Sequence, residues 1–403
     1  MYIRRLSLTN FRNYSRLELT LPPRVVLLHG ANAQGKTNLL EAIYYLATSR
    51  SPQTASDREL INWIADQEEM VPYARLATEV MRGGRARQIE IVLQKEPLVG
   101  GELVAEERTR LQKQIRVDKA KRRALDLVGQ INVVLFMPQD MALVDGPPSV
   151  RRRYLDVALC QVDAEYCRAL SHYNRVLAER NALLRQWHER RIDPDELAYW
   201  NEQLVGYGVT VVLRRRDAVA ELDQRATELH HHLSGGAERL RLVYEPTLAL
   251  NTEDDLEHLS ATYRADLVRR HRHEIERGMT LIGPHRDELR FLVNQYIDLG
   301  RFGSRGQQRT AVVALKLAEV DWMRQRTGEW PILLLDEVLA ELDTQRRDFL
   351  LAQMNGVEQA LITTTDPAFF DADLLARVTL LRVEEGRVFS DPAAFDGEQE
   401  AHV

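Results

Sequence analysis

Apolar positions in the first fifty residues change from strand spacing to helix spacing. Residues 1–9 alternate between apolar and polar, and residues 25–28 form an unbroken apolar run typical of a buried strand. Two prolines at residues 22–23 mark a turn before that run. Residues 38–47 then carry apolar side chains at helical spacing. The pattern predicts strand, turn, strand, loop and helix in this order.

A strand-rich region comes next. Residues 74–81 and 88–93 alternate as strands do, and the Arg-Gly-Gly-Arg sequence between them predicts a hairpin turn. Strand-like spacing continues through residues 115–117 and ends in the apolar run 132–136. Residues 74–136 are therefore predicted to be rich in strands.

The spacing becomes helical after the Gly-Pro-Pro sequence at residues 146–148. Apolar residues recur at intervals of four and three over residues 155–177, which predicts one long amphipathic helix. An Asp-Pro pair at residues 193–194 separates it from a second helix that ends at the glycines 235–236, and residues 252–276 are helical again. Because these helices are too short and too interrupted for a coiled-coil rod, we expect a compact helical lobe.

Strand patterns resume after residue 279. Residues 289–293 are strand-like, a glycine-rich segment at residues 300–309 opens another helix, and residues 331–335 and 360–365 are apolar runs of buried strands. The chain therefore alternates between strands and helices on both sides of the helical lobe, which is typical of an α/β fold.

The length of 403 residues is too great for one ordinary hydrophobic core. We predict two lobes. Lobe I is discontinuous and consists of residues 1–148 and 277–403, and the mainly helical lobe II consists of residues 149–276.

Composition is that of an ordinary globular protein, with 44% hydrophobic and 28% charged residues. No apolar run approaches the length of a membrane span, and the N-terminal residues lack the apolar core of a signal peptide. Cys160 and Cys167 are seven residues apart in a helical pattern, too far apart to form a bridge. We expect reduced thiols and a cytoplasmic protein without a membrane partner.

The net charge of −6 gives no general support for nucleic-acid binding. Basic residues are nevertheless clustered, for example at residues 151–153, 214–216 and 269–272. Such runs are more often solvated faces than binding sites, so composition alone does not identify DNA as a partner.

Residues 30–37 match the phosphate-binding loop pattern G-x-x-x-x-G-K-[ST] at every fixed position, between a predicted strand and a predicted helix. Backbone N–H groups at a helix N-terminus bind anions, and the glycines permit a tight turn and a close approach. We expect Lys36 to lie along the β- and γ-phosphates and the Thr37 hydroxyl to ligate Mg²⁺. The candidate nucleotide-binding residues are Gly30, Ala31, Asn32, Ala33, Gln34, Gly35, Lys36, Thr37 and Asn38.

Two carboxylates, Asp336 and Glu337, follow the apolar run 332–335. The first carboxylate at such a strand end typically holds Mg²⁺ through water, and the second accepts a proton from the water that attacks the γ-phosphate. Acidic residues are common at strand ends, so this pair indicates a nucleotide site only in combination with the phosphate loop.

The sequence Gly-Ser-Arg-Gly-Gln at residues 303–307 resembles the signature loop of ATP-binding-cassette (ABC) ATPases. A serine and a glycine at a helix N-terminus form a second anion site. In that superfamily the signature contacts ATP bound by the opposite subunit, which makes Ser304, Gly306 and Gln307 candidate contacts across a dimer. The alternative is a capped helix start without a ligand.

Three more segments resemble ABC loops. Gln139 lies where the Q-loop glutamine reaches Mg²⁺ and the attacking water, and Asp343 lies in a segment similar to the D-loop beside the partner's site. Many ABC ATPases place a switch histidine where this chain has three threonines, so Thr364 or Thr365 is the candidate hydroxyl donor there.

With these motifs placed, the chain resembles the RecF family of bacterial DNA replication and repair ATPases over essentially its whole length. The segments that carry the resemblance are residues 8–14, 30–37, 146–156, 281–287, 303–309 and 333–343. The resemblance implies an ABC-type P-loop ATPase head, with a mixed sheet, helices and an inserted helical lobe, similar to SMC heads without their long coiled coil.

The same resemblance implies ATP and Mg²⁺ as cofactors, ATP-dependent homodimerisation and slow hydrolysis. It implies binding to double-stranded DNA and to gapped junctions of single- and double-stranded DNA, and work with RecR and RecO to load RecA. It also implies that Arg12 and Asn13 border the nucleotide.

Two other classes of ATPase or GTPase share the phosphate loop. The ATPase subunit of a membrane transporter would carry a small helical subdomain that couples to membrane partners, and the long helical lobe of this chain fits that role poorly. A P-loop kinase or GTPase would leave Ser304 unexplained, and no Asn-Lys-x-Asp guanine motif is present.

Overall fold

The computed structural model describes residues 1–97, 109–187, 194–249, 254–354 and 356–390. The chain divides into two compact units, one formed by Met1–Pro138 with Met323–Val403 and the other by Gln139–Trp322. Among the described residues, no helix has the length and apolar character required to cross a bilayer. Neither Cys160 nor Cys167 forms a disulfide, as expected.

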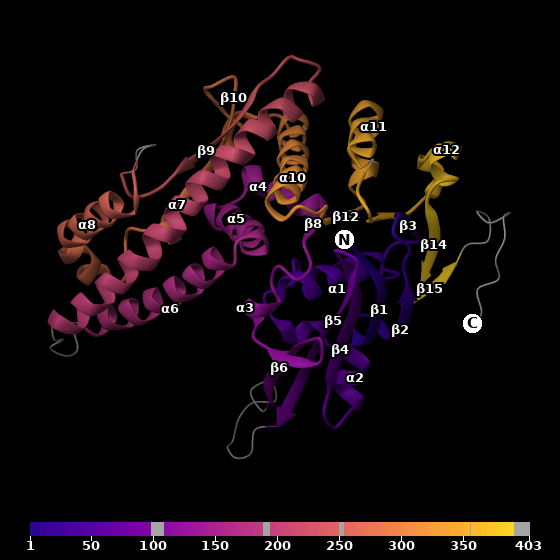
Figure 1. The fold of residues 1–403 in the computed structure, drawn as a ribbon, viewed down its shortest axis with the longest axis horizontal. Coiled ribbons are helices and arrows are strands. Elements are labelled where there is room, and N and C mark those ends of the chain that lie inside the picture. Colours follow the sequence, from indigo (N-terminus) through magenta and orange to yellow (C-terminus); the bar gives the residue numbers. More distant parts are fainter. Residues whose placement is uncertain (98–108, 188–193, 250–253, 355, 391–403) are drawn as a thin grey trace. The chain divides into compact units, whose positions relative to one another are not determined.

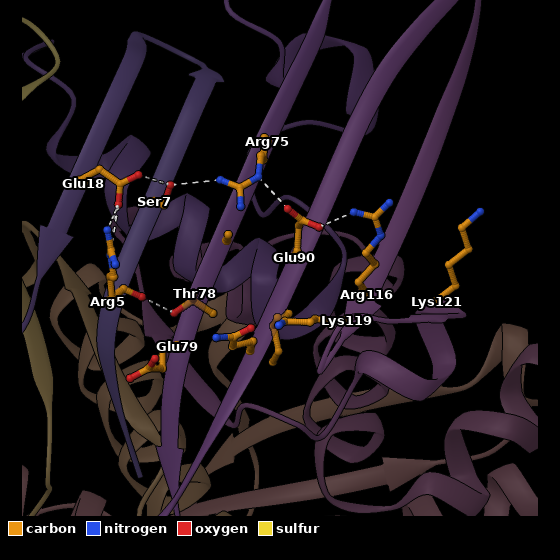
Figure 2. Close-up of a pocket in the computed structure, with 13 residues that line it drawn as sticks. Arg5, Ser7, Glu18, Arg75, Thr78, Glu79, Glu90, Arg116, Lys119 and Lys121 are labelled. Carbon is orange, nitrogen blue, oxygen red and sulfur yellow. Dashed lines mark hydrogen bonds and ion pairs between the residues drawn. The ribbon is translucent and has the colours of Figure 1, made fainter.

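The first unit contains an antiparallel sheet in the order β2-β1-β4-β5-β6-β7. The predicted hairpin at residues 74–93 is confirmed as β4 and β5, and β4 alternates between buried and half-buried positions because one face packs on the core. Figure 2 shows the opposite face, which carries charged side chains. The bounds of the strands are β1 (Tyr2–Phe11), β2 (Tyr14–Thr20), β4 (Tyr73–Arg82), β5 (Arg85–Pro97), β6 (Thr109–Val117) and β7 (Ala120–Arg122).

A second sheet of the same unit has the order β15-β14-β3-β13-β12-β8, and its strands are parallel except for β15. Helix α1 (Lys36–Thr48) shares one hydrophobic core with strands of both sheets. The bounds of the strands are β3 (Val25–His29), β8 (Val133–Phe136), β12 (Ile332–Asp336), β13 (Ala360–Thr364), β14 (Thr379–Glu384) and β15 (Arg387–Ser390).

The other described helices of the first unit are short. They lie in the connections between strands and at the ends of the sheet. Their bounds are η1 (Asp57–Leu60), α2 (Trp63–Glu68), α3 (Ala124–Leu127), η5 (Val338–Glu341), α11 (Thr344–Gln353), η6 (Pro367–Phe369) and α12 (Ala372–Leu375).

The second unit is mainly helical. Helices α6 and α7 pack side by side (Figure 1), and aromatic and aliphatic residues of α6, α7 and α8 form a core of their own. The bounds of its helices are η3 (Pro138–Met141), α4 (Ala142–Asp145), α5 (Pro148–Val162), α6 (Ala164–Gln186), α7 (Pro194–Leu233), α8 (Leu256–Arg277), η4 (Pro284–Arg286), α9 (Leu299–Phe302) and α10 (Arg305–Thr327), with the first and last crossing the division between the units.

A three-stranded antiparallel sheet, β11-β10-β9, belongs to this helical unit. Its strands are β9 (Leu240–Glu245), β10 (Glu288–Val293) and β11 (Ile297–Asp298). The sequence places the lobe boundaries at residues 148 and 277, whereas the compact units meet after Pro138 and after Trp322. The difference arises because β10 pairs with β9 along its whole length, which joins the segment after residue 277 to the helices.

One predicted element is wrong. The helix predicted over residues 155–177 is divided at Asp163 into α5 and α6. The Asp163 carboxylate accepts hydrogen bonds from the N–H groups of Glu165 and Tyr166, both at 2.9 Å, and so caps the start of α6. The apolar spacing continues across this break, which is why periodicity alone does not reveal it.

Candidate nucleotide site

The parallel sheet brings two distant segments to one edge. Strand β13 lies between β3 and β12, and its residue Thr363 is opposite Leu28 on one side and Asp336 on the other. The carboxyl ends of β3 and β12 therefore meet at the same edge, where α/β sheets place their ligand sites. The loop of residues 30–37 follows β3 at this edge. Asp336 is the last residue of β12, and Glu337 comes directly after it.

The Lys36 side chain folds back onto the backbone of the phosphate loop. Its Nζ atom donates to the carbonyl oxygens of Gly30 at 2.8 Å and Ala31 at 3.0 Å, and the side chain is only 3% exposed. The loop tip, formed by Ala31, Asn32 and Ala33, is exposed. The lysine is therefore held beneath an open loop, where a phosphate group would be accessible to it.

Two glycines make this loop conformation possible. Gly30 has a φ of 153° and Gly35 a φ of 114°, which disfavour side chains. A Cβ atom on Gly30 would lie 2.3 Å from the Val383 carbonyl oxygen, and one on Gly35 would lie 2.5 Å from Asn13 Nδ2. Because backbone and side chains already fill this space, neither position admits a larger residue.

Thr37 and Asp336 are in direct contact. The Thr37 hydroxyl is 2.8 Å from Asp336 Oδ1 and 3.0 Å from Oδ2, although the residues are 299 positions apart. Burial raises the pKa of Asp336, and hydrogen bonds from Thr37 and Thr363 oppose that rise. A threonine hydroxyl and a carboxylate are oxygen ligands of the kind that Mg²⁺ prefers. The chemistry of the pair therefore fits a magnesium ion, and its role as a metal ligand stays a prediction.

Glu337 follows directly and has a left-handed backbone with a φ of 55°. Its N–H group donates to Thr363 Oγ1 at 2.9 Å, and its Oε1 atom lies 3.3 Å from Lys36 Nζ. The Thr363 hydroxyl in turn donates to Asp336 Oδ1 at 2.9 Å. The Thr363 hydroxyl thus holds both carboxylate residues. The hydroxyl of Thr364, the candidate donor named from the sequence, donates instead to the Asp366 carbonyl oxygen.

The turn between β1 and β2 braces the loop. Asn13 Nδ2 donates to the Gln34 carbonyl oxygen at 2.9 Å, and Asn13 Oδ1 accepts from Asn38 Nδ2 at 2.8 Å. The buried Tyr14 hydroxyl donates to the Gly35 carbonyl oxygen at 2.9 Å. The Gln34 side chain accepts from the Glu385 N–H group at 2.7 Å. Hence Asn13, Gln34 and Asn38 hold one another in this structure.

Arg12 makes a two-pronged ion pair with Glu41 on α1. Its Nε and Nη2 atoms each lie 2.8 Å from a Glu41 carboxylate oxygen, and Glu41 is fully buried. The guanidinium group therefore ties the β1–β2 turn to the helix that follows the phosphate loop. Sequence reasoning missed Glu41, Tyr14 and Thr363; the one available signal was an acid inside the apolar pattern of residues 38–47.

The signature-like segment lies in the second unit and opens α10. The Ser304 hydroxyl accepts from the Gln307 N–H group at 3.2 Å, and Gln307 Oε1 accepts from the Ser304 N–H group at 2.8 Å. This is a reciprocal capping box. Ser304 and Gly306 are exposed, and space beside Gly306 is open. The helix start is therefore both capped and accessible.

The last two predicted site residues are on loops. Gln139 is exposed in η3, at the start of the second unit. Asp343 caps α11 by accepting from the Arg346 N–H group at 2.9 Å, and this bond lowers the pKa of the Asp343 carboxyl group. Their roles toward a nucleotide stay predictions.

Comparison with known families gives a match along nearly the whole chain. The family model described as the RecF/RecN/SMC N terminal domain matches residues 2–385. A protein of Chloroflexus aurantiacus named DNA replication and repair protein RecF is 47% identical over an alignment of 402 positions, which covers 97% of this chain and 100% of that protein. A protein of the same name from Listeria welshimeri is 37% identical and covers 96% of this chain and 99% of its own.

Solved structures are similar as well. The recombination mediator protein RecF with ATP, from the RecFOR pathway, matches with a TM-score of 0.83 and 28% identity over 96% of this chain and 97% of that chain. An SMC head bound to the C-winged helix domain of ScpA matches with a TM-score of 0.53 and 14% identity, covering 97% of each chain. The fold is therefore the ABC-type ATPase head, as the sequence predicts.

Proposed function

The chain belongs to the RecF family of DNA replication and repair proteins, and from this premise we propose that it is an ATPase whose ATP-bound dimer holds DNA. The observation that carries the proposal is the contact of Thr37 with Asp336 at 2.8 Å, across 299 positions of the chain. A phosphate loop and a metal-binding carboxylate meet in this way in nucleotide hydrolases.

In this proposal each residue of the site has one role. Lys36 balances the charge of the terminal phosphates, and Thr37 and Asp336 hold Mg²⁺. The metal, when bound, neutralises charge that develops on the transferred phosphoryl group. Glu337 accepts the proton of the attacking water, and Gln139 orients that water.

Lys36 Nζ and Glu337 Oε1 lie 3.3 Å apart, so the two charges partly neutralise each other. Drawing Lys36 toward the phosphates would release Glu337 to act as a base. This exchange makes the base available only in the loaded site, which suits slow, regulated hydrolysis.

The second copy of the chain completes the site in this proposal. Its exposed Ser304 and Gly306, with Gln307, contact the γ-phosphate from the start of α10, and its Asp343 lies beside the ATP of the first copy. A dimer that closes on ATP brings two basic surfaces together, so phosphate contacts too weak in one copy become effective in two.

The partners that we propose are those of the recombination mediator pathway. The protein holds double-stranded DNA near gaps, acts with RecR and RecO, and so promotes the loading of RecA onto gapped DNA. Hydrolysis of ATP opens the dimer and returns it to its starting state. The similarity to a RecF protein of the RecFOR pathway supports this assignment.

The variant Glu337→Gln tests the proposal. It keeps the size of the side chain but removes the base, so we expect ATP turnover to fall by about 100-fold or more while ATP still binds and the dimer persists. Turnover is measured by phosphate release and the dimer by size-exclusion chromatography with light scattering. Turnover equal to that of the parent protein would remove Glu337 from this role.

A further inference from the structure

The second unit has a surface hollow with a basic lining. Its volume is about 430 Å³, and none of its lining residues is acidic. Three of them come from the last two turns of α8, and the other two from the segment that follows this helix (Figure 1). We call it the α8 hollow, and its lining residues are Arg270, His273, Arg277, Leu281 and Arg286.

Helical spacing explains why the basic residues face the hollow together. Arg270, His273 and Arg277 are three and four positions apart, so they share one face of α8. The nearby acid Glu274 points the other way and is fully buried. Its two carboxylate oxygens accept from Arg180 Nη2 at 2.6 Å and from the Leu281 N–H group at 2.8 Å. Glu274 is thus unable to neutralise the hollow.

The basic run at residues 269–272 is divided by the helix into two classes. Arg269 pairs with Asp266 at 2.9 Å, and Arg272 pairs with Glu276 at 3.3 Å. The basic residues of α8 that line the hollow belong to the other class. Within the ranges that the structure describes, the side chains of Arg270, His273 and Arg277 form no hydrogen bond or ion pair, and all three are exposed.

Arg286 supplies a further guanidinium from outside the helix. It belongs to the segment 281–287, which the sequence singles out without giving it a role. Its Nη2 atom lies 3.3 Å from the Thr280 carbonyl oxygen, so one edge of the group is held and the remainder is exposed to the hollow. Three arginines therefore converge on one hollow without a carboxylate.

We propose that the α8 hollow binds the phosphodiester backbone of DNA. The inference rests on the proposed function, since it names the surface that a DNA-holding protein uses. Arginine is the side chain best suited to phosphate, because its planar fork donates two parallel hydrogen bonds. From Arg270 to Arg277 the helix advances about 10 Å. One DNA strand carries a phosphate every 3.4 Å or so along its axis, so this row spans about three phosphates.

The charged face of the antiparallel sheet is the other candidate surface (Figure 2). Its arginines already pair with carboxylates, since Arg75 and Arg116 share Glu90, at 2.7 and 2.9 Å, and Arg5 pairs with Glu18 at 3.1 Å. A phosphate would have to displace these carboxylates. The lining of the α8 hollow contains no carboxylate, so an anion there meets no such competition.

A pair of double variants with equal charge change tests this assignment. The first is Arg270→Gln with Arg277→Gln, which empties the α8 hollow of two cations. The control is Arg269→Gln with Arg272→Gln, which removes two cations from the same helix that lie outside the hollow. Binding of fluorescent duplex DNA in saturating ATP is measured by anisotropy over a series of salt concentrations, with the dimer assayed in parallel by light scattering.

For the hollow variant we expect affinity to fall by about tenfold or more near 0.1 M salt, and the slope of log K against log salt to decrease in magnitude by about 2. The control should keep the slope of the parent protein, and both variants should keep ATP-driven dimerisation. Equal affinity of parent and hollow variant, or equal losses in both variants, overturns the inference. Absence of DNA binding by the parent protein itself contradicts the proposed function instead.

Discussion

At the scale of single residues, Thr363 holds the two carboxylate residues in place. Its hydroxyl donates to Asp336 and accepts the N–H group of Glu337, whose left-handed backbone is rare for a residue with a side chain. We predict that Thr363→Val lowers ATP turnover by about tenfold or more, with a smaller loss of ATP affinity. Steady-state phosphate release and calorimetric titration with ATP measure the two effects.

Thr364→Val is the matched control. It removes a hydroxyl from the next residue, one that bonds only within its own turn to the Asp366 carbonyl oxygen. Turnover in this variant should stay within about twofold of the parent protein. A larger loss from Thr364→Val than from Thr363→Val would show that the wrong threonine has been assigned to the site.

Arg12 and Glu41 form a buried ion pair, and its contribution to the free energy of unfolding can be measured. Removing one partner leaves a buried charge without compensation, which costs about 3–5 kcal/mol. We therefore expect Arg12→Ala to lower the free energy of unfolding by about that amount, and Arg12→Ala with Glu41→Ala to recover part of the loss. Denaturant unfolding of the parent protein and of each variant provides the cycle. Strictly additive losses would mean that the two side chains do not interact.

At the scale of elements, periodicity and motifs predicted most of the chain because both are local. Apolar spacing located the β4–β5 hairpin and α7, and the phosphate-loop pattern located β3 and α1. The break at Asp163 was missed because one capping side chain ends a helix without changing the apolar spacing. Strand β14 was missed because it is defined by pairing with β3, some 350 positions earlier in the chain.

The candidate site was likewise predicted where a local motif marks its residues. Lys36, Thr37, Asp336 and Glu337 were predicted from short motifs whose backbone geometry is fixed by neighbouring residues. Tyr14, Glu41 and Thr363 act through contacts that depend on where distant segments return, so a local pattern does not assign their roles. The role of Thr363 follows from the register of β13 against β3 and β12.

The segment after α8 makes a pH-dependent contribution to stability. Burial lowers the pKa of His285 to about 4, and the positive charges of Arg286, Arg152 and Arg180 act in the same direction. The ring Nδ1 atom lies 2.6 Å from the Tyr173 hydroxyl, and Nε2 lies 3.2 Å from the Thr280 carbonyl oxygen. Both contacts suit a neutral ring that accepts at Nδ1 and donates at Nε2.

Between about pH 6.5 and pH 4 the unfolded chain binds a proton on His285 that the native protein does not, so stability falls as the pH is lowered. Burial raises the pKa of Glu319 to about 7, which acts in the opposite direction over part of this range. The comparison of parent protein and His285→Gln isolates the histidine. As the pH is lowered through this range, the free energy of unfolding should fall by up to about 3 kcal/mol less in His285→Gln than in the parent protein. Parallel pH profiles from denaturant unfolding would rule this contribution out.

At the scale of the whole molecule, the account depends on two copies of the chain. In the proposed function, the phosphate loop and carboxylates of the first unit form one half of an ATP site, and the exposed start of α10 of a second copy forms the other half. An ATP-driven dimer would explain how a chain with a net charge of −6 holds DNA, because only paired basic surfaces would bind it strongly. The mass of the protein in solution is therefore the property that matters most.

Sedimentation velocity with a saturating non-hydrolysable ATP analogue and Mg²⁺ measures that mass directly. The account predicts a monomer of 46.4 kDa without nucleotide and a species of twice that mass with it. Lys36→Met removes the charge that faces the phosphates and should stay monomeric under both conditions. A parent protein that remains monomeric with the analogue, even when duplex DNA is supplied, would contradict the account.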